Sequence, residues 1–132
     1  MVLYAKDLAT MRGFYQGVFH LEIEQSEEDY VVLGSSTSQL VIVQVPASIA
    51  STIHIADPPG RRAQTPVKLV FDVESISAVR RAVLNLRGGM DPTESERVFQ
   101  GHRVCDGQDP EGNVVQFQQR HHNSCTRADS AE

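Results

Sequence analysis

The sequence predicts an α+β domain built from two copies of a βαβββ unit, and three observations lead to this prediction. A short apolar segment precedes an amphipathic helix in each half of the chain. The two helix starts are 68 residues apart, and three strand-like segments follow each helix. Because recurrence of one supersecondary unit is the signature of internal duplication, we expect the two units to form one curved mixed sheet shaped like a cup, with the helices packed on its outer face.

The first unit is predicted over residues 1–45. Residues 2–7 read as a short strand that ends at Asp7, whose carboxylate can accept the free backbone N–H groups of a helix start. Apolar residues then recur at helical spacing, at Leu8, Met11, Tyr15 and Val18. Strands are predicted over 21–25, 29–33 and 39–45, because polar or Gly/Ser-rich turns separate these segments.

A linker, residues 46–66, is expected to join the units without a helix, because four prolines interrupt it. The second unit is predicted over residues 67–120. Its first strand covers 67–73 and Ser75 caps its helix, which ends at Gly88 and Gly89. The helical positions match those of the first unit, at Ile76, Val79, Val83 and Leu86.

Three strands follow this second helix, over 93–99, 102–107 and 113–119. The sequence between the last two, residues 109–112, is Asp-Pro-Glu-Gly. It predicts a tight turn, since proline presets the second position and glycine tolerates a positive φ at the fourth. Residues 121–132 are polar and aperiodic, and we expect them to form a flexible tail.

Composition supports one folded domain over residues 1–120 and excludes several classes of protein. Of 132 residues, 40% are apolar and 22% charged, which is ordinary for a globular chain. A net charge of −5 argues against a nucleic-acid binder, which needs cations to neutralise phosphates. The sequence has neither the long apolar run of a membrane helix nor an export signal. We therefore expect a cytoplasmic protein in which Cys105 and Cys125 are free thiols.

Two segments resemble the vicinal oxygen chelate superfamily, which includes glyoxalases, bleomycin-resistance proteins and extradiol dioxygenases. The opening segment runs from Tyr4 to Leu8 and continues through Phe14-Tyr15 to 18–22, with Phe19-His20 where Leu-Gly is typical. The closing segment, residues 109–117, is similar to the last hairpin and strand of that family. The resemblance covers about residues 1–120. It implies the same fold, a small-molecule ligand and a homodimer.

In metal-using members of this superfamily, His, Gln or Glu side chains in the cup hold a divalent ion. Those positions come from the first strand of each unit and from the last strand. In this sequence the first position would precede Met1, the second is Lys68, and the closing Glu is replaced by Gln116. Since an ammonium has no lone pair and an amide carries no charge, we expect no metal and no other cofactor.

Strand alternation predicts which side chains line the cup. One face of each strand is apolar, and we assign the opposite face to a small-molecule site. Lys68 could hold an anionic group of the ligand, or it could pair with Asp72 or extend to the rim. His102 could also face the cup, as a ligand contact or a catalytic base, or it could be an ordinary half-exposed strand residue. The predicted lining is Val2, Tyr4, Leu40, Ile42, Lys68, Gln116 and Gln118.

Two functions of different class follow from these expectations. The first is a metal-free small-molecule-binding protein of the glyoxalase/bleomycin-resistance type. The second is an enzyme, either a lyase, isomerase or dioxygenase whose metal is held by substitutes such as His102 or Gln44, or an acid–base catalyst that uses Lys68 or Tyr4. A subunit or regulatory module is a third possibility. The sequence itself does not identify the ligand.

Overall fold

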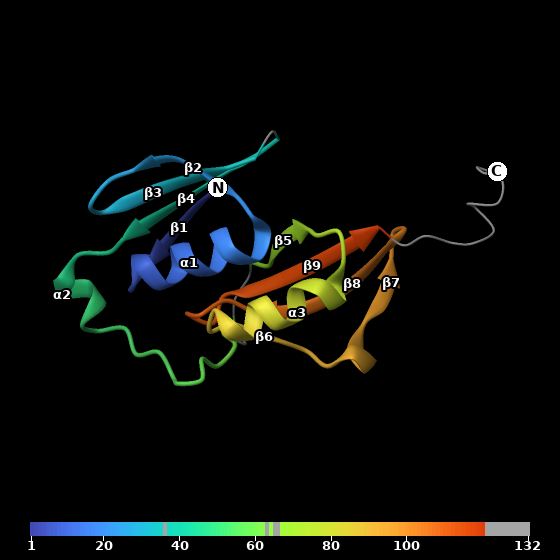
Figure 1. Ribbon diagram of the computed structural model, residues 1–132. Helices are drawn as coiled ribbons and strands as arrows, with labels where there is room; N and C mark the ends of the chain where they lie inside the picture. The colour runs from blue at the N-terminus through green and yellow to red at the C-terminus, as the bar shows by residue number, and fades with distance from the viewer. Residues whose placement is uncertain (36, 63, 65–66, 121–132) are drawn as a thin grey trace.

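The first unit of the computed structural model forms a four-stranded sheet and one helix (Figure 1). The structure describes residues 1–35, 37–62, 64 and 67–120, so the predicted tail lies outside the described residues. The strand order is β1-β4-β3-β2, in which β1 runs parallel to β4 and the other pairs are antiparallel. The elements are β1 (Val2–Ala5), α1 (Leu8–Phe19), β2 (Glu22–Ser26), β3 (Tyr30–Gly34) and β4 (Gln39–Gln44).

The second unit repeats this arrangement around a five-stranded sheet. Its strand order is β5-β9-β8-β6, with β7 also paired to β8. Here too the first strand, β5, runs parallel to the last, β9. The elements are β5 (Leu69–Asp72), α3 (Ile76–Asn85), β6 (Gly89–Met90), β7 (Arg97–Phe99), β8 (His102–Gln108) and β9 (Val114–Arg120). The α+β class and the two repeated units predicted from the sequence are confirmed, but their strands form two separate sheets and not the single curved sheet that was expected.

Three local features differ from the sequence prediction. The predicted strand over 93–99 is a 3-10 turn, Thr93–Ser95, followed by the short β7. The two-residue β6 was not predicted. The linker contains a helix, α2 (Ala47–Ala50), although its prolines argued against one. Pro46 precedes this single turn with φ −58°, a position where the missing N–H costs nothing.

Both predicted helix caps are confirmed. The Asp7 carboxylate accepts hydrogen bonds from the Thr10 backbone N–H at 3.2 Å and from the Thr10 hydroxyl at 2.8 Å. Ser75 Oγ accepts the Ala78 N–H at 3.2 Å. At the end of α1, His20 has φ 56° and donates its backbone N–H to Gln16 O. A non-glycine residue thus occupies the left-handed conformation that usually selects glycine.

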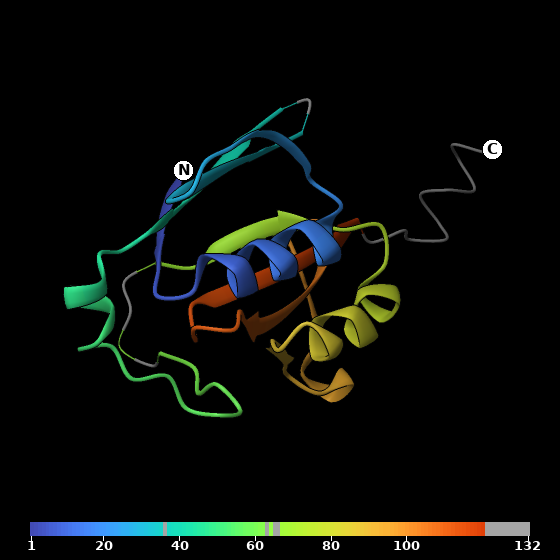
Figure 2. The ribbon, with the colours of Figure 1, turned by 60° about the vertical axis from the view of Figure 1, so that its left-hand side comes forward.

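One continuous core joins the two units, and α1 lies at its centre (Figure 2). The Phe19 ring lies 4.3 Å from the Phe71 ring of β5 and 5.6 Å from the Phe117 ring of β9. Tyr15 also contacts Phe71, with ring centroids 5.6 Å apart. Because the helix of the first unit packs against the sheet of the second, the units fold as one domain.

The predicted orientation of β4 is wrong. Leu40 and Ile42 were expected to line the cup, but they are 2% and 0% exposed and belong to the core. The opposite face of this sheet carries Tyr4, which is 68% exposed. Because β4 is apolar on both faces, alternation could not show which face the helix covers.

No helix among the described residues is long and apolar enough to span a membrane.

Candidate functional site

A polar cluster of three side chains, Lys68, Asp106 and Gln116, lies on the second sheet. Lys68 Nζ donates to Asp106 Oδ2 at 2.9 Å, and Gln116 Nε2 donates to Asp106 Oδ1 at 3.1 Å. Strand pairing brings two of these residues together, because Asp106 in β8 lies directly opposite Gln116 in β9. Lys68 immediately precedes β5, which pairs with the other edge of β9.

The polar cluster lies on the face of the second sheet turned away from the helices, here called the open face. Val115 and Phe117 alternate with Gln116 along β9 and are buried in the core. Gln119 points to the helical side, where its Oε1 accepts the first backbone N–H of α3, that of Ile76. Gln116 and Gln118 therefore face the other way. This agrees with the orientation that the sequence predicted for both glutamines.

Asp106 is ionised in the cluster. Its partial burial opposes ionisation, but the hydrogen bonds from Lys68 and Gln116 and the positive charges of Lys68 and Arg97 outweigh that effect. The pKa of Asp106 therefore lies below its usual value. The Lys68 side chain is 40% exposed and the Asp106 side chain 17%, so the pair is reachable from solvent.

A second amide–carboxylate pair lies beside the cluster. Gln118 Nε2 donates to Asp72 Oδ1 at 2.7 Å, and the two residues are register partners in β9 and β5. The suggested pairing of Lys68 with Asp72 is wrong, because Lys68 pairs with Asp106 instead. The open face thus carries two glutamines, each held by its own aspartate.

Two predicted site residues lie apart from the polar cluster. His102 is at the start of β8, opposite Arg120, and its Nδ1 lies 3.1 Å from Gln100 O. Four residues of strand, roughly 13 Å, separate it from Asp106. Tyr4 lies on the first sheet, and no hydrogen bond between described residues joins it to the cluster.

Asp106 was not selected from the sequence, although a signal for it was present. The turn at residues 109–112 fixes the pairing of the two strands that flank it, and that pairing places Asp106 opposite Gln116. Counting outward from the turn would have identified the carboxylate that binds both predicted site residues.

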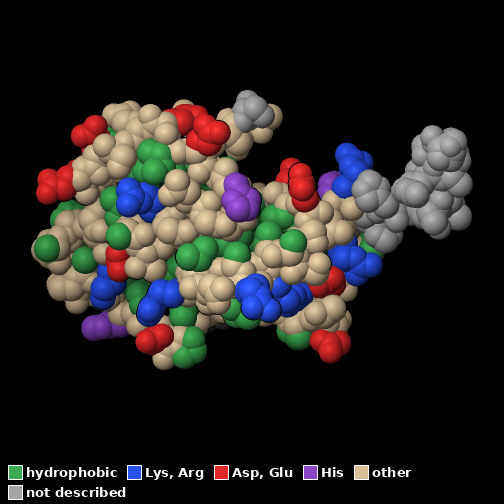
Figure 3. Space-filling model, viewed as in Figure 1, with side chains coloured by type: hydrophobic (Ala, Val, Ile, Leu, Met, Phe, Trp, Pro, Cys, Tyr) green, Lys and Arg blue, Asp and Glu red, His purple; other side chains and the backbone are tan. Residues whose placement is uncertain are grey.

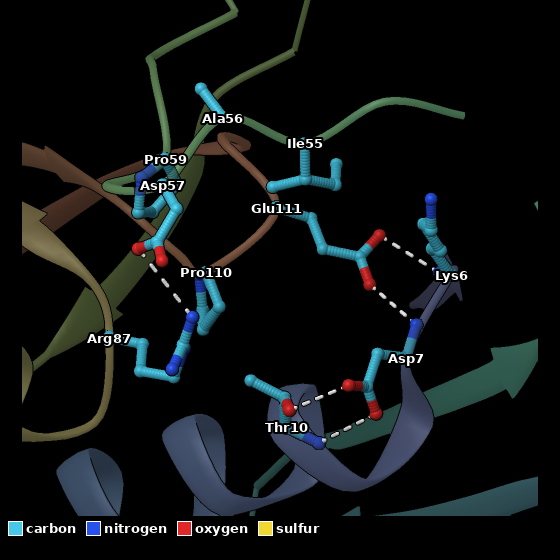
Figure 4. Close-up of a pocket in the computed structure, with 10 residues that line it drawn as sticks. All are labelled: Lys6, Asp7, Thr10, Ile55, Ala56, Asp57, Pro59, Arg87, Pro110 and Glu111. Atoms are coloured by element: carbon cyan, nitrogen blue, oxygen red, sulfur yellow. Dashed lines mark hydrogen bonds and ion pairs between the residues drawn. The ribbon is translucent and has the colours of Figure 1, made fainter.

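The turn between β8 and β9 also connects the second unit to the first. Glu111, which is 5% exposed, accepts the backbone N–H groups of Lys6 at 2.9 Å and of Asp7 at 2.8 Å (Figure 4). These contacts satisfy donors at the turn into α1. Gly112 has φ +87°, as the turn prediction required. A Cβ atom at this position would collide with Gly60 O, so no larger residue fits there.

Asp109, at the start of the same turn, is fully buried. One oxygen accepts the N–H groups of Glu111 and Asn113, and the other accepts the Tyr15 hydroxyl at 2.7 Å. Burial raises the pKa of Asp109 despite these donors, and burial together with Asp109 raises that of Tyr15 well above its usual value. Both carboxylates of the turn therefore have structural partners.

A hollow of about 350 Å³ lies beside this turn and is drawn in Figure 4. The Arg87 guanidinium at its edge is 3.6 Å from the Asp57 carboxylate, and both side chains are largely exposed. The Asp7 and Glu111 carboxylates on its other side are already occupied by hydrogen bonds. We assign this hollow to the junction between the units rather than to a ligand.

The surface charge differs between the two units. Exposed acidic side chains lie along β2 and in the turn after it, at Glu22, Glu24, Glu27, Glu28 and Asp29. Figure 3 shows several acidic side chains along the upper left edge of the molecule and Lys and Arg side chains lower on the same face, with further acidic side chains near the lower edge. The acidic edge lies on the first sheet, whereas the polar cluster lies on the second.

The polar cluster does not fit the divalent metal that the fold allows. Lys68 and Gln116 occupy two of the expected ligand positions, and both bind Asp106. The Lys68 ammonium would repel a cation, and the one ligand atom that Gln116 offers is an uncharged amide oxygen. No group of three His, Cys, Asp or Glu side chains within residues 1–35, 37–62, 64 and 67–120 is arranged to hold an ion.

Solved structures show what this chain resembles. FosX, a fosfomycin resistance protein from Mesorhizobium loti, matches with a TM-score of 0.63 at 14% identity, over 97% of this chain and 93% of its own. A putative glyoxalase from Bacillus halodurans matches with a TM-score of 0.67 at 16% identity, over 90% and 92%. The bleomycin resistance determinant of transposon Tn5 matches with a TM-score of 0.56 at 15% identity, over 92% and 95%.

No protein-family model and no curated protein sequence matches the chain. The structures above belong to the vicinal oxygen chelate superfamily, and the fold expected from the two sequence segments is confirmed. At this level of identity the match establishes the fold alone.

Proposed function

We propose that this chain binds a small organic ligand on the open face of its second sheet, without a metal ion. The observation that carries the proposal is the Lys68–Asp106–Gln116 cluster, in which Lys68 and Gln116 stand at two of the positions that the sequence resemblance assigns to metal ligands. It supplies fixed polar groups that reach solvent beside apolar side chains such as Val70, which is 47% exposed. A few polar groups in an apolar surround are the usual composition of a ligand site.

The comparisons support a binding function of this kind. Two of the similar structures are named as fosfomycin and bleomycin resistance proteins, and a third as a glyoxalase. The proposal extends to this chain the binding of an organic molecule, but not the identity of that molecule. A homodimer in the cytoplasm belongs to the same proposal. The homodimer is supported by exposed apolar side chains on both sheets, at Val2, Tyr4 and Val70.

A thermal-shift screen tests the proposal. Small aromatic amides, phenols and carboxylates would be added to protein kept in EDTA, and divalent metals would be added in a parallel series. A ligand that binds the native state raises the unfolding temperature, and the rise grows with the logarithm of the ligand concentration once that exceeds the dissociation constant. We expect organic compounds to stabilise the chelated protein and Lys68→Met to remove the effect. Stabilisation by organic compounds only in the presence of a metal would favour the lyase, isomerase or dioxygenase alternative.

A further inference from the structure

We infer that the polar cluster recognises a neutral carboxamide group rather than a carboxylate. The inference rests on the proposed ligand-binding function and specifies the chemical class of the ligand. It departs from the sequence expectation that Lys68 holds an anion. The reason is the partner that the structure gives to Lys68.

The charges around the cluster balance. Lys68 and Arg97 supply two positive charges, and Asp72 and Asp106 supply two negative ones. Asp106 stays ionised because its pKa is lowered. Two further cations among the described residues lie on or near this face. Arg61 binds Gln108 Oε1 and is itself paired with Asp91, and Arg120 is four residues along β9 from Gln116, roughly 13 Å away. An incoming carboxylate would therefore meet no net positive charge to compensate its lost hydration.

Two groups of the cluster remain free to bind a ligand: the remaining N–H donors of Lys68 and the Oε1 acceptor of Gln116. The Lys68 ammonium has three N–H donors, of which Asp106 takes one. Gln116 must turn its NH2 group toward Asp106, because an ionised carboxylate only accepts hydrogen bonds. Its Oε1 is thus fixed as an acceptor, and no described residue donates to it.

Gln116 is 8% exposed, so an unsatisfied Oε1 costs free energy unless a ligand or solvent donates to it. A primary carboxamide satisfies both sides, since its carbonyl oxygen accepts from Lys68 Nζ and its NH2 donates to Gln116 Oε1. A carboxylate has no hydrogen to donate, and its second oxygen would lie against Oε1, acceptor to acceptor. The donors and acceptors left in the cluster therefore favour the amide.

Benzamide and benzoate provide a matched pair of probes, equal in shape and different in charge and hydrogen bonding. Their dissociation constants would be measured by ligand-observed NMR on the chelated full-length chain. For the wild type we expect benzamide to bind about tenfold more tightly, a ratio equivalent to ~1.4 kcal/mol. Lys68→Met should weaken benzamide binding by a similar factor. Equal binding, tighter benzoate binding or no binding of either probe would overturn the inference.

Asp106→Asn gives the sharper test, because it leaves the cluster with a net positive charge and should reverse the preference toward benzoate. Glu28→Gln, the same kind of change at an exposed position of the first unit, should leave the preference for benzamide intact. Retained benzamide preference in a folded Asp106→Asn variant, checked by circular dichroism, would contradict the charge argument. The wider EDTA screen tests the proposed function separately. If other organic compounds bind to the open face, the proposed function stands even where the carboxamide preference fails.

Discussion

Glu111→Gln should strongly destabilise the protein although it changes a single oxygen to nitrogen. The carboxylate accepts two backbone N–H groups across the junction of the units, at 2.9 and 2.8 Å. A glutamine keeps one acceptor and turns its NH2 group toward the other N–H. Hydrogen bonds to charged groups contribute about 1.5–3 kcal/mol, and leaving a buried donor unpaired adds to the loss. We expect the free energy of unfolding to fall by about 2–3 kcal/mol.

Urea unfolding measures this loss. The chain has no tryptophan, so far-ultraviolet circular dichroism is the suitable signal. With an m-value of about 2 kcal/mol/M, the midpoint should fall by about 1 M or more at unchanged m. Glu28→Gln, at an exposed position, is the matched control and should shift the midpoint very little. If both variants unfold at the wild-type midpoint, the turn between β8 and β9 does not join the two units as described.

Three further predictions concern single side chains. His20→Gly should raise the free energy of unfolding by about 1 kcal/mol, because His20 has φ 56° and only glycine adopts that conformation without strain; a lower urea midpoint would refute this. The pKa of Asp106 is lowered in the native state, so its contribution is present above the usual carboxyl pKa and is lost as pH falls through the lowered value. Asp106→Asn should therefore be less stable than the wild type at pH 7 by about 1 kcal/mol or less, and the difference should vanish in acid; a gap that widens in acid would contradict it. Cys105 is 0% exposed and burial raises its thiol pKa, so in a Cys125→Ser background a thiol reagent should react only as the protein unfolds. A rapid reaction would show that Cys105 is accessible in the native state.

Much of the fold could be predicted because its signals are local. Asp7 and Ser75 each precede a helical pattern of apolar residues, and both cap their helices as expected. The Asp-Pro-Glu-Gly turn was equally readable, since each residue has a defined conformational role. Repetition of the pattern then identified the two units.

The site was harder to predict because it depends on pairing between distant strands. Ile42 was expected to line the cup, and because both faces of its strand are apolar, the sequence could not show that it belongs to the core. The structure buries it beneath α1. Lys68 lies on the face that alternation predicted, but its partner could not be chosen between Asp72 and Asp106 without the register of β8 against β9. That partner decides the charge of the cluster, on which the proposed preference for a carboxamide depends.

Elemental analysis of protein purified without chelators, combined with ligand titration before and after EDTA treatment, shows whether the chain binds its ligand without a metal. We predict far less than one divalent ion per chain and an unchanged dissociation constant after chelation. One ion per chain, removed only by EDTA together with ligand binding, would contradict the assignment of Lys68, Asp106 and Gln116 as the binding groups.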